Sequence, residues 1–469
     1  MMKNILAYVL SGVLALSFNN KSIAQKYTPA DGWADAQISL RAGKSVTAQQ
    51  RTAWWRNARF GMFIHWNPSS SVASEISWSK QFYNDDGEKL LENPRPDAGF
   101  SGGPEHREWL DWFKPAVPNV VYDNLYKSFY PGMFNADTIV AQAKQAGMKY
   151  IVMVAKHHDG FCMWDSKYTD FDMMSTPFKK DILGEMAAAA HKAGLKFGIY
   201  YSQRDWHQPD YTPATMAKYN TYMRNQLQEL LTNYGEIATL FFDSGEWKTW
   251  QLWEGDTLFK MIYSLQPNIV INDRCGVPAD YATPEQTLGS FDNKRDWESC
   301  MTFTGFWSWH GYQTPVISYG ACLKYLISCA GGDGNLLMNI GPMPTGQIDT
   351  REATRLQQVG TWLQKNGESI YGTRGGPFLP DSNVASTYKG NEVFLHIFKM
   401  QYDGIVLPGI KEKIIKAEIL MGPAITFNQT KNDIQLTIPQ TYKNEIVTVI
   451  KLTLNKKIDE AQIPLHKKN

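Results

Sequence analysis

A chain of 469 residues is longer than one ordinary hydrophobic core requires, so we expect two folded domains. The formal net charge of +1 gives no electrostatic basis for binding nucleic acid or an anionic membrane surface, and neither is an expected partner. The five cysteines match no disulfide or zinc-site spacing, and we interpret them as mostly buried thiols.

The N-terminus has the features of a secretory signal peptide. Lys3 precedes a largely apolar run over residues 5–18, and small residues follow as far as Ala24. We therefore expect cleavage near residue 24 and export of the mature protein to the periplasm or the medium. The apolar run is too short for a stable membrane span and no later stretch is apolar enough, so no membrane span is expected.

From residue 60 onward, apolar runs of strand length alternate with helical patterns. The expected strands cover residues 60–65, 150–155, 197–202, 239–243, 269–273, 335–340 and, in a weaker region, 296–301. The expected helices cover residues 136–145, 182–192, 217–233, 258–265, 318–329 and 351–365. Repeated strand–helix units predict an α/β fold with a parallel sheet, and their number favours a (β/α)8-like TIM barrel over an open sheet.

Two regions depart from this alternation. Residues 67–122 form a long, turn-rich stretch, which we expect to be a rim that shapes the substrate entrance. After residue 375 the pattern changes to short strands, expected at residues 393–398, 414–419, 434–438 and 446–454. This pattern predicts a small C-terminal β-sandwich. The expected division is therefore a signal peptide over 1–24, a barrel over 25–375 and a sandwich over 376–469.

Polar and aromatic side chains follow four of the expected strands at their carboxyl ends. In chain order they are His65, Trp66, His157, His158, Trp206 and Asp243. Barrel enzymes hold their chemistry at this edge of the sheet, so we expect one sugar-sized pocket there. Several tryptophans beside polar turns, Trp309 among them, are expected to line it, because flat rings stack on the apolar faces of sugars.

Glycoside hydrolysis needs two carboxyl groups, one that attacks or orients water and one that protonates the leaving oxygen. Asp243 ends an apolar strand and is the first candidate, although an aspartate there could also cap a following helix. Its possible partners are Glu246, Glu285 and Glu298. The sequence alone leaves these three open.

The histidines allow a second interpretation, a metal-dependent hydrolase. His65, His157 and His158 together with Asp243 would make a plausible barrel metal site. Adjacent residues on a strand point to opposite faces, however, so at most one of His157 and His158 should aim inward unless the strand bends there. We therefore expect neutral histidines that hydrogen-bond sugar hydroxyls, with no metal and no other cofactor.

Several longer motifs occur in order between residues 54 and 372, and each alone is weak. They are Arg59–Trp66, Phe134–Asp137, Ala143–Tyr150, Lys156–Phe161, Tyr200-Tyr201-Ser202 with Trp206, Phe241-Phe242-Asp243, Asn272-Asp273-Arg274, Trp297-Glu298 and Gly334–Pro342. Together these motifs are highly specific, and the sequence resembles the retaining α-L-fucosidases of glycoside hydrolase family 29.

The resemblance implies a barrel with a C-terminal β-sandwich, a covalent two-carboxylate mechanism and no metal. It makes Asp243 the nucleophile, and Glu285 is the preferred acid/base because its Thr-Pro-Glu context is similar to part of the family, with Glu298 as the alternative. The residues expected to bind the sugar are His65, Trp66, His157, His158, Tyr201, Trp206 and Trp309.

Three local features depart from the family pattern: Asp243-Ser244-Gly245-Glu246 replaces a common Asp-Gly, aromatic residues are added before Ser308, and His310 splits a common Trp-Gly-Tyr. They leave the sugar open, since an apolar pocket rejects one added hydroxyl only by about a hundredfold. We expect an exported exo-α-L-fucosidase acting on an oligosaccharide or polysaccharide. An α-L-galactosidase and a sugar-binding protein without turnover are the alternatives.

Overall fold

The computed structural model describes residues 48–80, 117–243, 250–276, 279–398, 404–442 and 446–463. All of them belong to the second of two compact units, Leu40–Asn469. The expected signal peptide, Glu246 and the middle of the expected rim, residues 81–116, lie outside the described residues. Within the described ranges, no helix combines the length and the apolar character that crossing a membrane requires.

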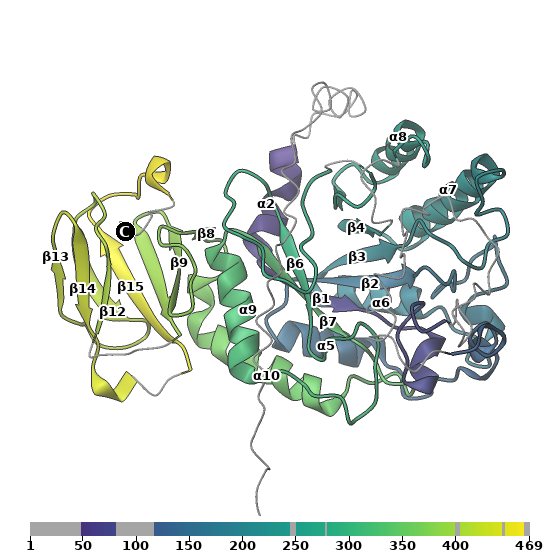
Figure 1. Ribbon diagram of the computed structural model, residues 1–469, viewed down its shortest axis with the longest axis horizontal. Coiled ribbons are helices and arrows are strands. Elements are labelled where there is room, and N and C mark those ends of the chain that lie inside the picture. The colour runs from purple at the N-terminus through teal and green to yellow at the C-terminus, as the bar shows by residue number, and fades with distance from the viewer. Residues whose placement is uncertain are drawn as a thin grey trace, which may run out of the picture. The chain divides into compact units, whose positions relative to one another are not determined.

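Seven parallel strands form the curved central sheet (Figure 1). Their spatial order is β5-β4-β3-β2-β1-β7-β6, and every neighbouring pair is parallel. The strands are β1 Phe60–Ile64, β2 Tyr150–Lys156, β3 Lys196–Tyr201, β4 Thr239–Phe242, β5 Val270–Ile271, β6 Glu298–Thr302 and β7 Asn335–Ile340. This sheet confirms the predicted (β/α)8-like barrel, and the strands are apolar on both faces because helices cover the outside.

An irregular segment, residues 280–286, lies between the two edge strands β5 and β6. Tyr281 forms a parallel bridge to the residue after β5, and Glu285 forms one to Cys300 of β6. Pro284 interrupts regular pairing here because proline has no N–H to donate to a ladder. The segment therefore takes the place of an eighth strand.

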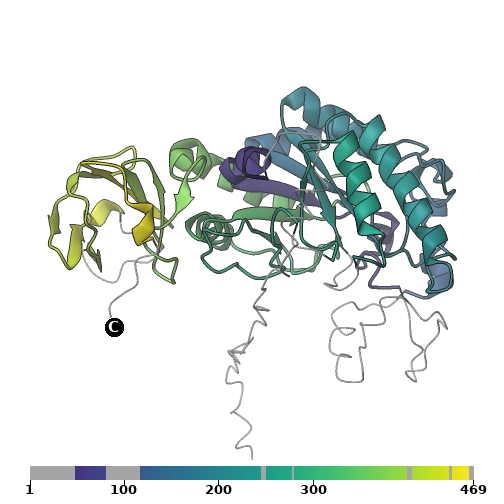
Figure 2. The same cartoon turned by 90° about the horizontal axis from the view of Figure 1, so that it is seen from above.

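The main helices of the barrel run alongside the strands (Figure 2). They are α2 Ala48–Ala58, α5 Ala136–Gln145, α6 Ile182–Ala193, α7 Met216–Asn233, α8 Gly255–Leu265, α9 Tyr319–Gly331 and α10 Thr350–Asn366. The sequence explains their ends: Asp181 accepts from Gly184 N at the start of α6, and Gly194 closes α6 with φ 75°. Six of these helices confirm predictions to within a few residues, whereas α2 was not predicted.

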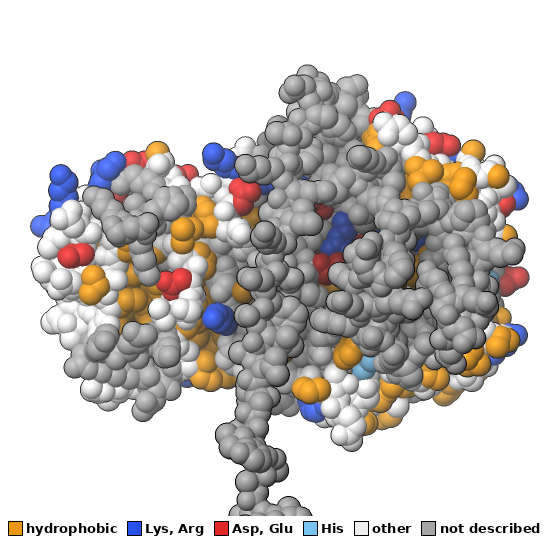
Figure 3. Space-filling view, in the orientation of Figure 1, with side chains coloured by type: hydrophobic (Ala, Val, Ile, Leu, Met, Phe, Trp, Pro, Cys, Tyr) orange, Lys and Arg blue, Asp and Glu red, His pale blue; other side chains and the backbone are white. Residues whose placement is uncertain are grey.

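Two antiparallel sheets follow, with the orders β12-β15-β10-β9-β8 and β11-β14-β13. Their strands are β8 Arg374–Gly375, β9 Val384–Lys389, β10 Glu392–Ile397, β11 Gly404–Pro408, β12 Ile414–Ile419, β13 Phe427–Gln429, β14 Asp433–Thr437 and β15 Thr448–Leu454. They share one apolar core that includes Leu395, Ile434 and Ile450, which confirms the predicted β-sandwich. Among the described residues on the face in Figure 3, acidic and basic side chains are interspersed.

Candidate active site

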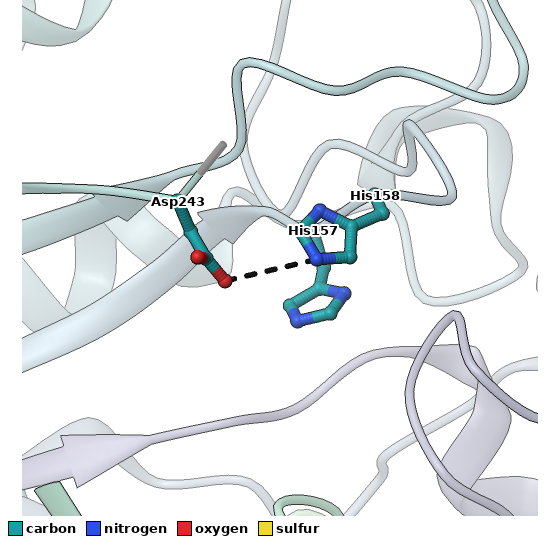
Figure 4. A group of neighbouring side chains, drawn as sticks. All are labelled: His157, His158 and Asp243. Atoms are coloured by element: carbon teal, nitrogen blue, oxygen red, sulfur yellow. Dashed lines mark ion pairs between the residues drawn. The ribbon is translucent and has the colours of Figure 1, made fainter. Parts of the chain in front are cut away.

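The carboxyl ends of β1, β2 and β4 bring three histidines to one carboxylate. His65 follows β1, His157 and His158 follow β2, and Asp243 follows β4. Ligand atoms of His157, His158 and Asp243 all lie within 4.8 Å of one another, and Figure 4 shows both imidazole rings beside the carboxylate. The predicted convergence of these strand ends is therefore present in the fold.

Both adjacent histidines reach Asp243 because strand β2 is irregular at its end. Its register with β3 shifts between Val154 and Lys156, and the strand stops before His157. The expectation that at most one of the two histidines aims inward applies to a regular strand. The irregular end of β2 allows both of them to face Asp243.

Serine hydroxyl groups fix the orientation of the two rings. His157 Nδ1 shares a hydrogen bond of 2.6 Å with Ser77 Oγ, and His158 Nδ1 shares one of 2.6 Å with Ser202 Oγ. The Nε2 atom of His158 lies 3.7 Å from Asp243 Oδ2. Ser77 belongs to the described part of the expected rim, so that stretch contributes directly to the site.

Asp243 is held as an ionised carboxylate by neighbouring donors. Tyr200 Oη donates to Oδ2 at 2.7 Å, and Arg274 Nη1 lies 3.1 Å from Oδ1. Burial alone would raise the pKa of Asp243, but the charge of Arg274 and the hydrogen bond from Tyr200 outweigh it and lower the pKa. A carboxylate in this state can attack an electrophilic carbon at neutral pH.

The Asn272 side chain fixes the backbone immediately before Asp243. Its Oδ1 accepts from Phe242 N and its Nδ2 donates to Phe242 O, both at 2.8 Å. The amide thus continues the ladder beyond β5, which is only two residues long. This gives the Asn272-Asp273-Arg274 motif a structural role.

Arg274 connects Asp243 to a second carboxylate, Glu285. Its Nη1 atom lies 2.7 Å from Glu285 Oε2 and 3.1 Å from Asp243 Oδ1, so these two oxygens are at most about 5.8 Å apart (3.1 plus 2.7). Arg274 Nε also donates to Thr283 Oγ1 at 2.8 Å, which ties the guanidinium to the irregular segment. The Glu285 side chain is 42% exposed against 18% for Asp243.

Neutral imidazole and indole rings surround this pair. His65 Nδ1 shares a hydrogen bond of 2.7 Å with Asn339 Oδ1, and burial lowers the pKa of His65 to about 3. Burial also lowers the pKa of His157 well below its usual value. Trp307 lies 4.7 Å from the His65 ring and Trp206 lies 5.3 Å from the His158 ring, centroid to centroid.

Two residues expected in the sugar pocket point away from the site. Trp66 is buried against Phe129 and Phe134, and Tyr201 donates to Gln226 of α7. Side chains alternate along a strand, and each of these two residues is adjacent in sequence to a residue that does face the site. Trp309 Nε1 donates to Asp349, and its place in the pocket stays a prediction.

Glu298 lies at the opposite end of the barrel from Asp243. It is the first residue of β6, and the hydroxyl of Tyr150, the first residue of β2, donates to its carboxylate. Burial raises the pKa of Glu298 to about 8. The nearest arginines in sequence pair with other carboxylates, Arg274 with Asp243 and Arg295 with Asp273. The structure therefore does not bring Glu298 to the site.

Trp307 was among the tryptophans beside polar turns that were expected to line the pocket, whereas Tyr200 and the bridging role of Arg274 were not predicted. Tyr200 pairs with Phe241, which shares a face with Asp243, but the register that brings them together is a property of the fold. Arg274 lies in a recognised motif, and that motif was the one signal that could have identified it.

Spacing alone would allow His157, His158 and Asp243 to hold a metal ion. Both oxygens of Asp243 are already engaged, Oδ1 by Arg274 and Oδ2 by Tyr200. A guanidinium this close would also repel a cation. The donor set therefore fits an ion poorly.

A parallel barrel with two neighbouring carboxylates at its mouth, walled by neutral histidines and aromatic rings, defines a glycoside hydrolase. A sequence model of the family described as Alpha-L-fucosidase matches residues 27–368. The chain belongs to the α-L-fucosidase family, and it is an enzyme that acts on O-glycosyl bonds of glycans.

Individual relatives agree with this assignment. Plasma alpha-L-fucosidase of Pongo abelii is 28% identical over 434 residues, which cover 85% of this chain and 88% of that protein. The structure of α-L-fucosidase isoenzyme 1 from Paenibacillus thiaminolyticus is similar with a TM-score of 0.76 and 32% identity, over 87% of this chain and 100% of that one. A trapped covalent intermediate of an α-L-fucosidase from Bacteroides thetaiotaomicron has a TM-score of 0.73 and 25% identity, over 88% and 97%.

Proposed function

We propose that the protein is an exported, retaining exo-α-L-fucosidase. The observation that carries the proposal is the Arg274 Nη1 atom shared by Asp243 and Glu285, which keeps the two bound carboxylate oxygens at most about 5.8 Å apart (3.1 plus 2.7). Retaining glycosidases place their two carboxyl groups about 5–5.5 Å apart, whereas inverting enzymes need about 6.5–9.5 Å to admit a water molecule. The separation therefore supports the retaining route.

In the first step, the Asp243 carboxylate attacks the anomeric carbon as the bond to the leaving oxygen breaks. Glu285 gives its proton to that oxygen, so the leaving group departs as a neutral alcohol. In the second step, Glu285 takes a proton from water, the water oxygen attacks the anomeric carbon, and Asp243 is released. The relative trapped as a covalent intermediate supports such a route for this chain.

The remaining residues of the site would bind the terminal sugar. His65 and His157 present neutral imidazoles that suit hydrogen bonds with hydroxyl groups, and His158 adds a third ring beside them. Trp206 and Trp307 offer flat apolar surfaces. A set of side chains on one barrel mouth suits a single terminal residue, which is the basis for the exo assignment.

The proposal includes export and the domain division. The features of residues 1–24 support export. We place the start of the C-terminal domain at residue 374, the first residue of β8, instead of 376, because Arg374–Gly375 pairs with β9 of the sandwich.

The test is a screen of aryl α-L-fucoside, aryl α-L-galactoside and common D-glycosides, followed by NMR of the first anomer released. Hydrolysis of the fucoside with retention is the expected result. A higher kcat/KM on the L-galactoside would reassign the sugar, as the departures around residues 303–310 allow. Activity only on a D-sugar, net inversion, or calorimetric L-fucose binding without any hydrolysis would overturn the proposal.

A further inference from the structure

The hydroxyl group of Ser77 has a single acceptor within the described ranges, and that acceptor is His157. Ser77 Oγ accepts from Asp159 N at 2.8 Å and lies 2.6 Å from His157 Nδ1. A bond in the opposite direction, from the ring to the serine, would leave the hydrogen of a fully buried hydroxyl group without an acceptor. The Ser77 hydroxyl therefore donates to His157 Nδ1, and this nitrogen carries no proton.

The position of Ser77 is fixed by its neighbours. Its backbone has φ 59°, a left-handed conformation that is uncommon for serine. Ser77 N donates to Tyr122 Oη at 2.7 Å, and Tyr122 Oη donates to Asp159 Oδ2 at 2.7 Å. Because Asp159 N donates back to Ser77 Oγ, the three residues form a closed set of hydrogen bonds that aims the hydroxyl group at His157.

Asn339 of β7 imposes the opposite arrangement on His65. Its Nδ2 donates to Trp307 O at 2.7 Å, which fixes the orientation of the amide. The amide oxygen then lies 2.7 Å from His65 Nδ1, and this oxygen can only accept. His65 Nδ1 therefore carries a proton, whereas His157 Nδ1 does not.

The two rings differ in what their other nitrogen presents. Burial lowers the pKa of His65 to about 3 and that of His157 well below its usual value, so both rings are neutral at neutral pH. A neutral imidazole has one N–H group and one lone pair. His157 therefore presents an N–H donor at Nε2, and His65 presents a lone pair at Nε2. The ring centroids are 5.7 Å apart, so one sugar residue can contact both.

We propose that Ser77 and Asn339 are positioning residues for sugar recognition, and that they hold His157 and His65 in opposite tautomers. The hydroxyl group that meets His65 must then donate its hydrogen, and the hydroxyl group that meets His157 must accept one. The wrong tautomer at either ring would leave a buried polar atom unpaired, which costs more than a hydrogen bond gains. The proposal rests on the proposed function, because it requires a terminal sugar beside the two rings.

The first measurement is the NMR spectrum of the imidazole nitrogens in enzyme labelled at histidine, because protonated and unprotonated ring nitrogens give separate signals. The signals of the two rings are assigned by their loss in His65→Gln and His157→Gln. The expected result is a proton on Nδ1 of His65 and on Nε2 of His157. L-Fucose should shift the Nε2 signals of both rings without changing either tautomer.

Three variants test the two positioning residues. Ser77→Ala should allow the His157 proton to occupy either nitrogen, and it should lower kcat/KM on an aryl α-L-fucoside about three- to tenfold, as expected for one lost neutral hydrogen bond. Asn339→Leu should release the proton of His65 in the same way. Asn339→Asp retains an oxygen that accepts from His65 Nδ1, so it should keep the tautomer that Asn339→Leu loses.

Ser79→Ala is the matched control, two residues beyond Ser77. Ser79 is also buried, but its hydroxyl group donates to Glu75 O at 2.6 Å and lies 3.0 Å from Ser74 Oγ. Its loss should leave both tautomers and kcat/KM unchanged, because these contacts involve no histidine. A general disturbance of this segment would instead affect Ser77→Ala and Ser79→Ala alike and would contradict the proposal.

The outcomes separate this proposal from the one on which it rests. A proton on His157 Nδ1 or on His65 Nε2 in an active wild-type enzyme would overturn the proposal alone. So would an unchanged tautomer and an unchanged kcat/KM in Ser77→Ala, or an active enzyme whose Nε2 signals do not respond to L-fucose. No hydrolysis of the aryl fucoside by the wild-type enzyme would overturn the proposed function, and the role in sugar recognition with it.

Discussion

Tyr200 donates its hydroxyl to Asp243 Oδ2 across the boundary between strands β3 and β4, over 2.7 Å. Both side chains face the barrel interior, because Tyr200 pairs with Phe241 and Asp243 lies two residues further along the same face. A hydrogen bond to the charged form of a carboxylate stabilises that form.

The variant Tyr200→Phe removes this donor and should raise the pKa of Asp243. Activity requires the ionised carboxylate and is lost as pH falls through that pKa, so the acidic limb of kcat/KM should move to higher pH. Because a hydrogen bond to a charged group is lost, kcat/KM should also fall by about 10- to 100-fold. Tyr201→Phe, whose hydroxyl bonds Gln226, is the control and should leave the acidic limb in place.

Replacement of the nucleophile should affect every substrate equally. Asp243→Ala should lower kcat by about 10⁴-fold or more on aryl fucosides and disaccharides alike, because no covalent intermediate can form. Circular dichroism should show an intact fold. Residual activity that varies strongly with the leaving group would point to a different nucleophile.

The two glutamates should differ in their response to azide. Glu285→Ala should slow hydrolysis by about 10²- to 10⁴-fold, the range expected for a lost general acid/base. With an activated aryl fucoside, azide should restore turnover and yield a fucosyl azide, since this anion needs no general base. Azide should not raise the turnover of Glu298→Ala. Glu298→Gln is the matched variant that keeps the side-chain volume and leaves no cavity. The reverse pattern would exchange the two roles.

Glu298 should instead affect the pH dependence of stability. Its pKa is about 8 in the folded chain against 4.5 ordinarily, so the folded state keeps a proton that the unfolded state releases. This contribution is complete below about pH 4.5 and is lost as pH rises through about 8. Glu298→Gln should therefore reduce the fall in Tm between pH 5 and pH 9, measured by scanning fluorimetry, whereas the exposed Glu185→Gln should not.

Chelation should leave activity unchanged. Arg274 and Tyr200 bind the two oxygens of Asp243, and the guanidinium beside this carboxylate would repel a cation. The check is kcat/KM on an aryl fucoside before and after exhaustive dialysis against a chelator. A loss that zinc or another divalent ion restores would favour the metal-dependent alternative.

Local patterns in the sequence predicted most elements of the barrel, because apolar runs, caps and glycine stops act within a few residues. They also indicated that His65, His157, His158 and Asp243 would meet, since parallel strands end at one edge. Tyr201 was predicted to face the site, but Tyr200 does so. Both lie on one strand, and only the pairing with β4 shows which of them faces inward. The alternative assignment of Glu298 as acid/base was wrong for a related reason, since its position at the start of β6 places it at the other end of the barrel.

The two carboxylates lie on segments that differ in how regularly they pair with their neighbours. Asp243 ends a strand that is paired on both sides, whereas Glu285 lies on the segment that completes the ring through isolated bridges. Mutations within residues 280–286 can therefore change the surroundings of the leaving group and leave the strand that carries the nucleophile intact. Relatives of this enzyme could diverge in the bonds they cut while they continue to recognise the same terminal sugar.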